Sequence, residues 1–247
     1  MNYIYIMARN FLSNWCFLSL LIHVPNLNAS TNFETKFGRC PKYVVGKLFF
    51  QISEKFEKTK SLLEVKKLIT KENLEKKYFL SNYELKTNLT KSKLWIEFEC
   101  PRPLFQVIVN NPNLDKSNEL VLVSNGQLFD PTYIQFIQDE KEESIYLPYL
   151  SIPESTVDKK MMDSIVQLMK SNNKQVNKLI AEIIINNARE MKLILKLNNK
   201  SSVVYFGKNE WPGKMAKLER VLLHYKNSSS FPIKINMAIN KKVVVKF

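Results

Sequence analysis

Few residues of this 247-residue chain have the type and spacing that acid–base or metal chemistry requires. Beyond the first thirty residues there is one histidine, His224, and nothing at metal-ligand spacing accompanies it, so we predict a structural role. Glu97 and Glu99 are two residues apart on an expected strand and therefore share a face. Their carboxylates would lie about 7 Å apart, which could serve glycoside hydrolysis. The simpler interpretation is that they flank Trp95 on the hydrated face of a sheet.

The composition excludes most nucleotide enzymes. Phosphate-binding loops need several closely spaced glycines, and the chain has only 5 glycines and neither a Walker A nor a dinucleotide-binding motif. No serine nucleophile motif is present either. We therefore predict a protein that is not an enzyme, with no catalytic, cofactor-binding or metal-binding residues.

The net charge of +14 is weak evidence for a partner. It comes mostly from lysine, and the accompanying abundance of asparagine is typical of AT-rich coding. A basic surface nevertheless attracts phosphate, and Trp95 or Trp211 could stack on bases. A basic nucleic-acid-binding protein is therefore the alternative function, although the lysines are spread along the chain without an arginine cluster.

Residues 1–30 predict a signal peptide or signal-anchor. They contain a single base, Arg9, and an apolar run from Phe11 to Val24, followed by a polar exit. Such a segment would place the rest of the chain across a membrane, whether translation starts at Met1 or Met7. A buried amphipathic helix of a soluble protein is the alternative.

The cysteine pattern is compatible with export without establishing it. Cys40 and Cys100 could form one disulfide in an oxidising compartment, or they could remain free thiols.

Up to residue 130 the pattern predicts helices followed by strands. Lysine-rich residues 53–78 have apolar residues at mixed spacings of three and four, typical of one or two amphipathic helices. Residues 93–100 alternate in the manner of a strand with one buried face. Pro101-Arg102-Pro103 interrupts ladder pairing, and Asn125-Gly126 predicts a hairpin. Expected strands cover residues 78–89, 93–100, 104–109, 120–123 and 127–129.

Residues 130–158 are acidic and broken by prolines, which predicts a surface connection with one short strand at 145–150. A helix capped by Ser155 or Thr156 follows, and a second helix starts at Pro212. The remaining apolar runs predict strands at 179–185, 191–197, 203–206, 232–238 and 242–247.

This order of elements, together with several short motifs, resembles the FtsQ/DivIB family of cell-division proteins. The family's POTRA domain ends in a strand similar to residues 94–103, and its hairpin is similar to residues 122–129. Its Leu-Pro segment is similar to residues 147–153, and a strand pair and helix follow as in residues 203–222. The resemblance implies an α+β fold, with a POTRA-like domain and a mixed or antiparallel β domain with two flanking helices. We expect a signal or anchor at 1–30, a juxtamembrane segment at 31–52, the POTRA-like domain at 53–130 and the β domain at 131–247.

The resemblance implies a non-catalytic divisome scaffold in septum formation, anchored in the bacterial inner (plasma) membrane at the division site with its body outside the cytoplasm. Its partners would be FtsB-like and FtsL-like proteins, bound by strand addition at the C-terminal β domain, and the membrane, reached through the N-terminal segment. A last strand at a sheet edge offers unpaired backbone groups for such addition. Alternatively, the apolar residues of this strand simply complete the core. The partner-binding residues expected from this are Ile235, Met237, Val243, Val245 and Phe247.

Overall fold

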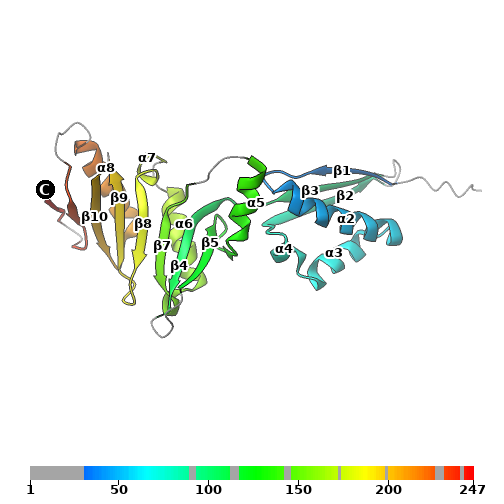
Figure 1. Ribbon diagram of the computed structural model, residues 1–247, viewed down its shortest axis with the longest axis horizontal. Coiled ribbons are helices and arrows are strands. Elements are labelled where there is room, and N and C mark those ends of the chain that lie inside the picture. Colours follow the sequence, from blue (N-terminus) through cyan, green and yellow to red (C-terminus); the bar gives the residue numbers. More distant parts are fainter. Residues whose placement is uncertain are drawn as a thin grey trace, which may run out of the picture.

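The strands of the chain form two sheets that lie side by side along the long axis of the molecule (Figure 1). Both sheets mix parallel and antiparallel pairs. The predicted α+β class, with a POTRA-like unit followed by a mixed β domain, is therefore confirmed, while the signal or anchor expected at 1–30 lies outside the described residues. The computed structural model describes residues 31–88, 93–111, 117–141, 146–171, 174–197, 200–225, 231–239 and 242–247.

The smaller sheet has three strands in the order β1-β3-β2, covered on one face by helices. Alternate residues of its central strand, Leu94, Ile96 and Phe98, are buried among the helices, as the sequence predicted. The elements are β1 (Asn32–Lys36), α2 (Lys42–Thr59), α3 (Leu62–Lys71), α4 (Leu74–Lys77), β2 (Asn82–Asn88) and β3 (Lys93–Glu99).

Residues 31–52, expected to be a juxtamembrane segment, contain β1 and the first part of α2. The helix begins at Lys42 rather than near Ser53 because Val45, Leu48 and Ile52 follow the helical period and are fully buried. This segment is thus part of the packed unit around the smaller sheet.

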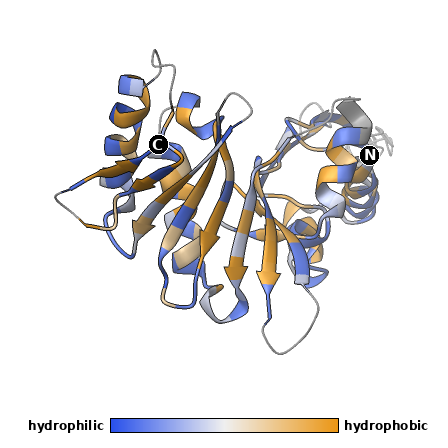
Figure 2. Ribbon diagram, turned by 60° about the vertical axis from the view of Figure 1, so that its left-hand side comes forward, coloured by the Kyte–Doolittle hydropathy of each residue, from blue (hydrophilic) through white to orange (hydrophobic). Residues whose placement is uncertain are grey.

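The larger sheet has nine strands, and α6 and α8 pack on one of its faces. Figure 2 shows the hydrophobic colour that runs along these strands. Its elements are β4 (Pro103–Asn110), β5 (Ser117–Val123), β6 (Leu128–Phe129), α5 (Thr132–Lys141), β7 (Tyr149–Pro153), α6 (Lys159–Ser171), α7 (Lys174–Asn177), β8 (Ile180–Ile185), β9 (Met191–Leu197), β10 (Lys200–Gly207), α8 (Trp211–Tyr225), β11 (Lys234–Asn236) and β12 (Val244–Lys246), in the sheet order β12-β11-β10-β9-β8-β7-β4-β5-β6.

Two predictions for residues 130–158 are wrong. The expected irregular connection contains α5, whose Tyr133, Ile134 and Ile137 form a buried apolar side that the neighbouring acidic residues obscure in the sequence. The next helix, α6, is capped by Asp158 rather than by Ser155 or Thr156, since Met161 N–H donates to Asp158 Oδ1 at 2.7 Å. That hydrogen bond is the main reason that the pKa of Asp158 lies below its usual value.

The two sheets share a hydrophobic junction built on β5. Leu122 belongs to the core between the larger sheet and its helices, whereas Val121 and Val123 belong to the core of the smaller sheet. The ring of Phe79 also meets the rings of Phe129 and Tyr133, at centroid distances of 5.4 and 5.0 Å. The end of β5, residues 121–123, is therefore buried on both faces.

This junction bears on the expected domain boundary at residue 130. The change of sheet falls at Pro101-Arg102-Pro103, because β4 and β5 pair within the nine-stranded sheet. However, β5 and α5 also bury side chains in the core of the smaller sheet. A division into domains 53–130 and 131–247 therefore crosses a shared core, and the domain limits stay a prediction.

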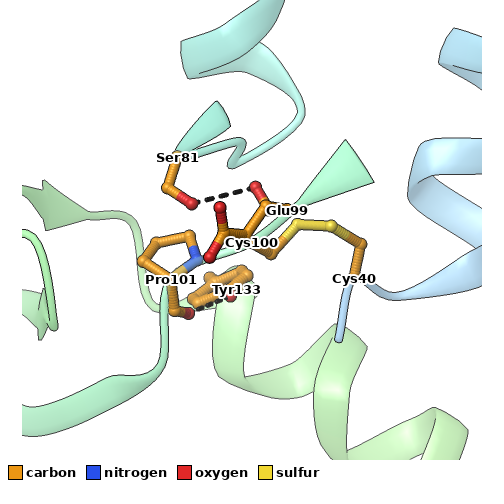
Figure 3. The surroundings of a disulfide bond; sticks show 6 residues. All are labelled: Cys40, Ser81, Glu99, Cys100, Pro101 and Tyr133. Carbon is orange, nitrogen blue, oxygen red and sulfur yellow. Dashed lines mark hydrogen bonds between the residues drawn. A yellow bond between two sulfur atoms is a disulfide. The ribbon is translucent and has the colours of Figure 1, made fainter. Parts of the chain in front are cut away.

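A disulfide joins Cys40 to Cys100 beside this junction (Figure 3), which decides between the two alternatives for these cysteines. Their Cα atoms are 5.0 Å apart. Cys100 directly precedes the connecting segment, and the hydroxyl of Tyr133 donates to the carbonyl oxygen of Pro101 at 2.6 Å. Burial raises the pKa of Tyr133, so its hydroxyl keeps the proton that it donates.

We expect removal of the disulfide to destabilise the chain. Its closed loop has a sequence separation of 60 residues, for which chain entropy gives about 4 kcal/mol. Cys40→Ser combined with Cys100→Ser should lower the free energy of unfolding by about 2–4 kcal/mol in urea titrations. A reductant should lower the stability of the wild type similarly and leave the double variant unchanged. Equal stability of the variant and the wild type would contradict this prediction.

The hydrogen bond at the junction gives a second prediction. Tyr133→Phe leaves the Pro101 carbonyl oxygen without this buried donor, so the free energy of unfolding should fall by about 1–3 kcal/mol. Tyr149→Phe is the matched control, because the ring of Tyr149 is exposed and its change should have no measurable effect. A Tyr133→Phe protein as stable as the control would show that the bond contributes nothing.

Candidate functional site

His224 lies on α8, apart from Glu97 and Glu99 on β3, and the side chains of His224 and Glu97 make structural contacts. His224 is exposed near the end of α8, and its ring meets that of Tyr225 at a centroid distance of 4.9 Å. Within the described residues, no group of three or more histidine, cysteine, aspartate and glutamate side chains could hold a metal ion.

Glu97 and Glu99 lie on the open face of the smaller sheet, near its junction with the larger one. Glu97 Oε1 accepts a hydrogen bond from Lys36 Nζ at 2.6 Å, and this contact raises the pKa of Lys36. Neighbouring ion pairs, Lys86 with Glu84 and Lys93 with Glu34, continue across the same three strands. Glu97 thus belongs to a set of paired surface charges, which fits the simpler of the two interpretations.

Neither tryptophan proposed as a platform for bases is free to stack. Trp211 is buried at the start of α8, and its indole N–H donates to the Gly207 carbonyl oxygen at 2.9 Å. Trp95 is half-buried beneath Lys86, whose ammonium lies 4.9 Å from the ring centroid. The geometry therefore does not favour the alternative of nucleic-acid binding.

The C-terminal strand β12 forms one end of the nine-stranded sheet. It pairs antiparallel with β11, which in turn pairs parallel with β10. No other described strand pairs with β12 on its outer side, so its outward backbone groups are available for hydrogen bonds. The edge strand expected from the sequence is therefore present.

The five predicted partner-binding residues divide into buried and accessible ones. Ile235 and Met237 are buried in the core beneath the edge, so a partner could not contact their side chains in this arrangement. Val245 is half-buried and packs against the same core, opposite Ile235. Val243 and Phe247 are exposed, and the Phe247 ring meets that of Tyr225 at 5.4 Å.

Sequence reasoning missed part of the exposed surface at this edge. Val244, which is not among the predicted partner-binding residues, is 56% exposed, as is Phe247. Ile233 and Ile239, which flank β11, are also exposed. The density of β-branched residues between 233 and 245 was the available signal, but only the strand order shows which of them face solvent.

Three lysines surround this apolar edge. Lys234, Lys242 and Lys246 are all exposed, and Lys234 Nζ lies 4.8 Å from the ring centroid of Tyr205 on β10. Because Lys234 and Lys246 are cross-strand partners, their charges lie close together on the sheet. The edge therefore combines apolar side chains with a positive potential.

The supporting strand is held by the helix behind it. Lys214 of α8 is buried, and its Nζ donates to the carbonyl oxygen of Phe206 at 2.6 Å, at the end of β10. This bond ties α8 to the strand next to β11. The amide of Met237 in turn donates to the carbonyl oxygen of Tyr205 at 2.8 Å, which extends the pairing of β10 and β11.

None of the helices among the described residues is both long and apolar enough to cross a bilayer. The predicted membrane segment at 1–30 lies outside these residues, so its role stays a prediction.

The comparisons with known proteins agree with the fold. No individual curated protein matches the sequence. A sequence model of the family described as "Cell division protein FtsQ/DivIB, C-terminal" matches residues 113–243, more than half of the chain. The matched region includes β5 to β11 with both α6 and α8, and it ends at the residue before β12. With this match, the chain belongs to the FtsQ/DivIB family and has a role in cell division.

Proposed function

We propose that this protein is a non-catalytic scaffold of the bacterial divisome that captures an FtsB-like or FtsL-like partner by strand addition at β12. The observation that carries the proposal is the position of β12 at the end of the nine-stranded sheet, with exposed Val243, Val244 and Phe247 beside its free edge. Backbone hydrogen bonds would supply affinity, and alternate side chains would supply specificity.

The positive charge of the edge indicates which kind of partner segment it would bind. Lys234, Lys242 and Lys246 would repel a basic strand and attract an acidic one. The partner strand is therefore an acidic segment with apolar residues on alternate positions, and its association should slow as salt is added.

The disulfide supports the proposed compartment. Structural disulfides persist in oxidising compartments outside the cytoplasm, and the Cys40–Cys100 bond lies in the body of the chain. The proposal therefore places this body outside the cytoplasm, at the division site of the plasma membrane, attached through residues 1–30.

Deletion of residues 242–247 should abolish capture of an FtsB-like partner by the purified protein. The fold should survive, because Val245 is the one residue of this segment that packs against the core. Val243→Asp combined with Val244→Asp should weaken binding at least tenfold, since carboxylates would replace apolar contacts at the edge, a loss of about 1.4 kcal/mol or more. Binding is measured by calorimetry with the partner in solution.

Leu63→Asp is the matched control for these edge variants. Leu63 is exposed like Val244 but lies on α3, at the other end of the molecule. Its substitution should leave partner binding unchanged. Normal capture by the deletion variant, with circular dichroism showing an intact fold, would rule out strand addition at β12.

In cells, a fluorescent fusion of the full chain should concentrate at mid-cell before septation. A fusion of residues 1–30 alone should spread over the membrane, because the recruiting surface proposed here is in the C-terminal sheet. Fluorescence microscopy distinguishes the two patterns. A uniform distribution of the full-length fusion around the cell would contradict the divisome role.

A further inference from the structure

Two aromatic side chains of α2, Tyr43 near its start and Phe50 near its middle, are exposed to solvent. α2 belongs to the unit around the smaller sheet, away from the C-terminal end of the larger sheet (Figure 1). Tyr43 and Phe50 are 70% and 72% exposed. They are about two helical turns apart and therefore lie on one side of α2, opposite the buried Leu48 and Ile52. A Cβ at Gly46, between them, would meet nothing within 4 Å, so this side of the helix is open. Two exposed aromatic side chains on one side of a helix are the apolar part of a candidate interaction surface.

α2 and the helix that follows it, α3, carry a strong positive charge. Residues 42–71, which span α2 and α3, contain eight lysines and three glutamates, a net charge of +5. Two of the glutamates are already paired with lysines of their own helices. Lys47 lies between the two aromatic residues, with its Nζ 4.5 Å from the ring centroid of Tyr43. Leu63 on α3 is also exposed, at 63%.

The position of α2 in the chain indicates what this surface contacts. Lys60, which follows α2, donates from Nζ to Thr31 Oγ1 at 2.8 Å. Thr31 is the first described residue, and the apolar run from Phe11 to Val24 precedes it closely in the sequence. The end of α2 therefore lies beside the point at which the chain continues toward its most apolar segment. A bilayer that held this segment would lie nearest to the Lys60 end of α2, and Phe50 and Tyr43 would reach it with the helix axis lying along the bilayer surface.

We propose that the solvent side of α2, together with the start of α3, docks on the surface of an anionic bilayer. Tyr43 and Phe50 would enter the boundary between headgroups and acyl chains, and Lys47 and Lys66 would lie among the lipid phosphates. Exposed aromatic side chains interspersed with lysines suit this boundary. This contact is separate from the predicted anchor and from the partner-binding edge. It sets the orientation of the smaller sheet on the membrane.

The test uses the chain from Thr31 to Phe247, which lacks the apolar segment that would itself bind membranes. This chain keeps every residue of both hydrophobic cores, since all of them lie between Phe33 and Val245. It should co-sediment with phosphatidylglycerol vesicles and not with phosphatidylcholine vesicles, and the bound fraction should fall as sodium chloride is added.

Two sets of substitutions separate the apolar and charged contributions. Tyr43→Ser combined with Phe50→Ser should lower partitioning into phosphatidylglycerol vesicles by about tenfold or more. Lys47→Gln combined with Lys66→Gln should lower it by about fivefold for each lysine removed. All four side chains are exposed or lie on the helix surface, so the fold should be retained.

Matched controls come from outside α2 and α3. Tyr146→Ser removes an aromatic residue that is also 70% exposed, and Lys192→Gln combined with Lys196→Gln removes the same charge from β9. Neither change should alter vesicle binding. Equal losses in the β9 variant and the α2 variant would show unspecific attraction, and so overturn the proposal. Absence of binding to phosphatidylglycerol, or binding of duplex DNA through the same lysines without vesicle binding, would also overturn it.

Discussion

The burial of the end of β5, residues 121–123, on both faces is the constraint on which the arrangement of the molecule depends. A strand whose alternate side chains enter two different cores cannot shift its register without removing apolar side chains from both. Leu122 and its neighbours Val121 and Val123 point in opposite directions, so each core fixes the position of the strand for the other. The two sheets are therefore held together by a shared strand as well as by the connection at Pro101-Arg102-Pro103.

The disulfide and the hydrogen bond of Tyr133 both hold the short connection between the two sheets. Cys100 follows the last residue of the central strand of the smaller sheet, Pro101 begins the connection, and the hydroxyl of Tyr133 of α5 donates to the Pro101 carbonyl oxygen (Figure 3). The disulfide ties this connection to the segment before α2, and the Tyr133 hydrogen bond ties it to α5. The two ends of the molecule therefore keep a defined distance. The helix α2 and the edge strand β12 belong to the units on either side of this junction (Figure 1). With a rigid junction, an orientation imposed on α2 would also set the position of β12.

Sequence periodicity predicted the elements whose burial pattern is simple. The strand at Lys93–Glu99 was recognisable because every second residue is apolar, and one face of this strand is indeed buried. The helix α5 was missed because its buried residues are few and its surroundings are acidic. The edge position of the last strand was expected from the family resemblance, but the burial of Ile235 and Met237 was not. Alternation shows that two faces differ, whereas the strand order and the packed helix decide which face meets solvent.

The residues that pack beneath the C-terminal edge stabilise β12 itself, and this role does not depend on a partner. β12 has only three residues in its ladder, and a strand this short is marginally stable without packing beneath it. Ile235 and Val245 provide that packing as cross-strand neighbours, so they hold the edge in place while Val244 stays exposed. The surrounding lysines then disfavour pairing between two copies of this edge, since like charges would meet. Strand addition at this edge, as proposed above, would depend on complementary charge as well as on apolar contact, which would favour an acidic strand over a second copy of the chain.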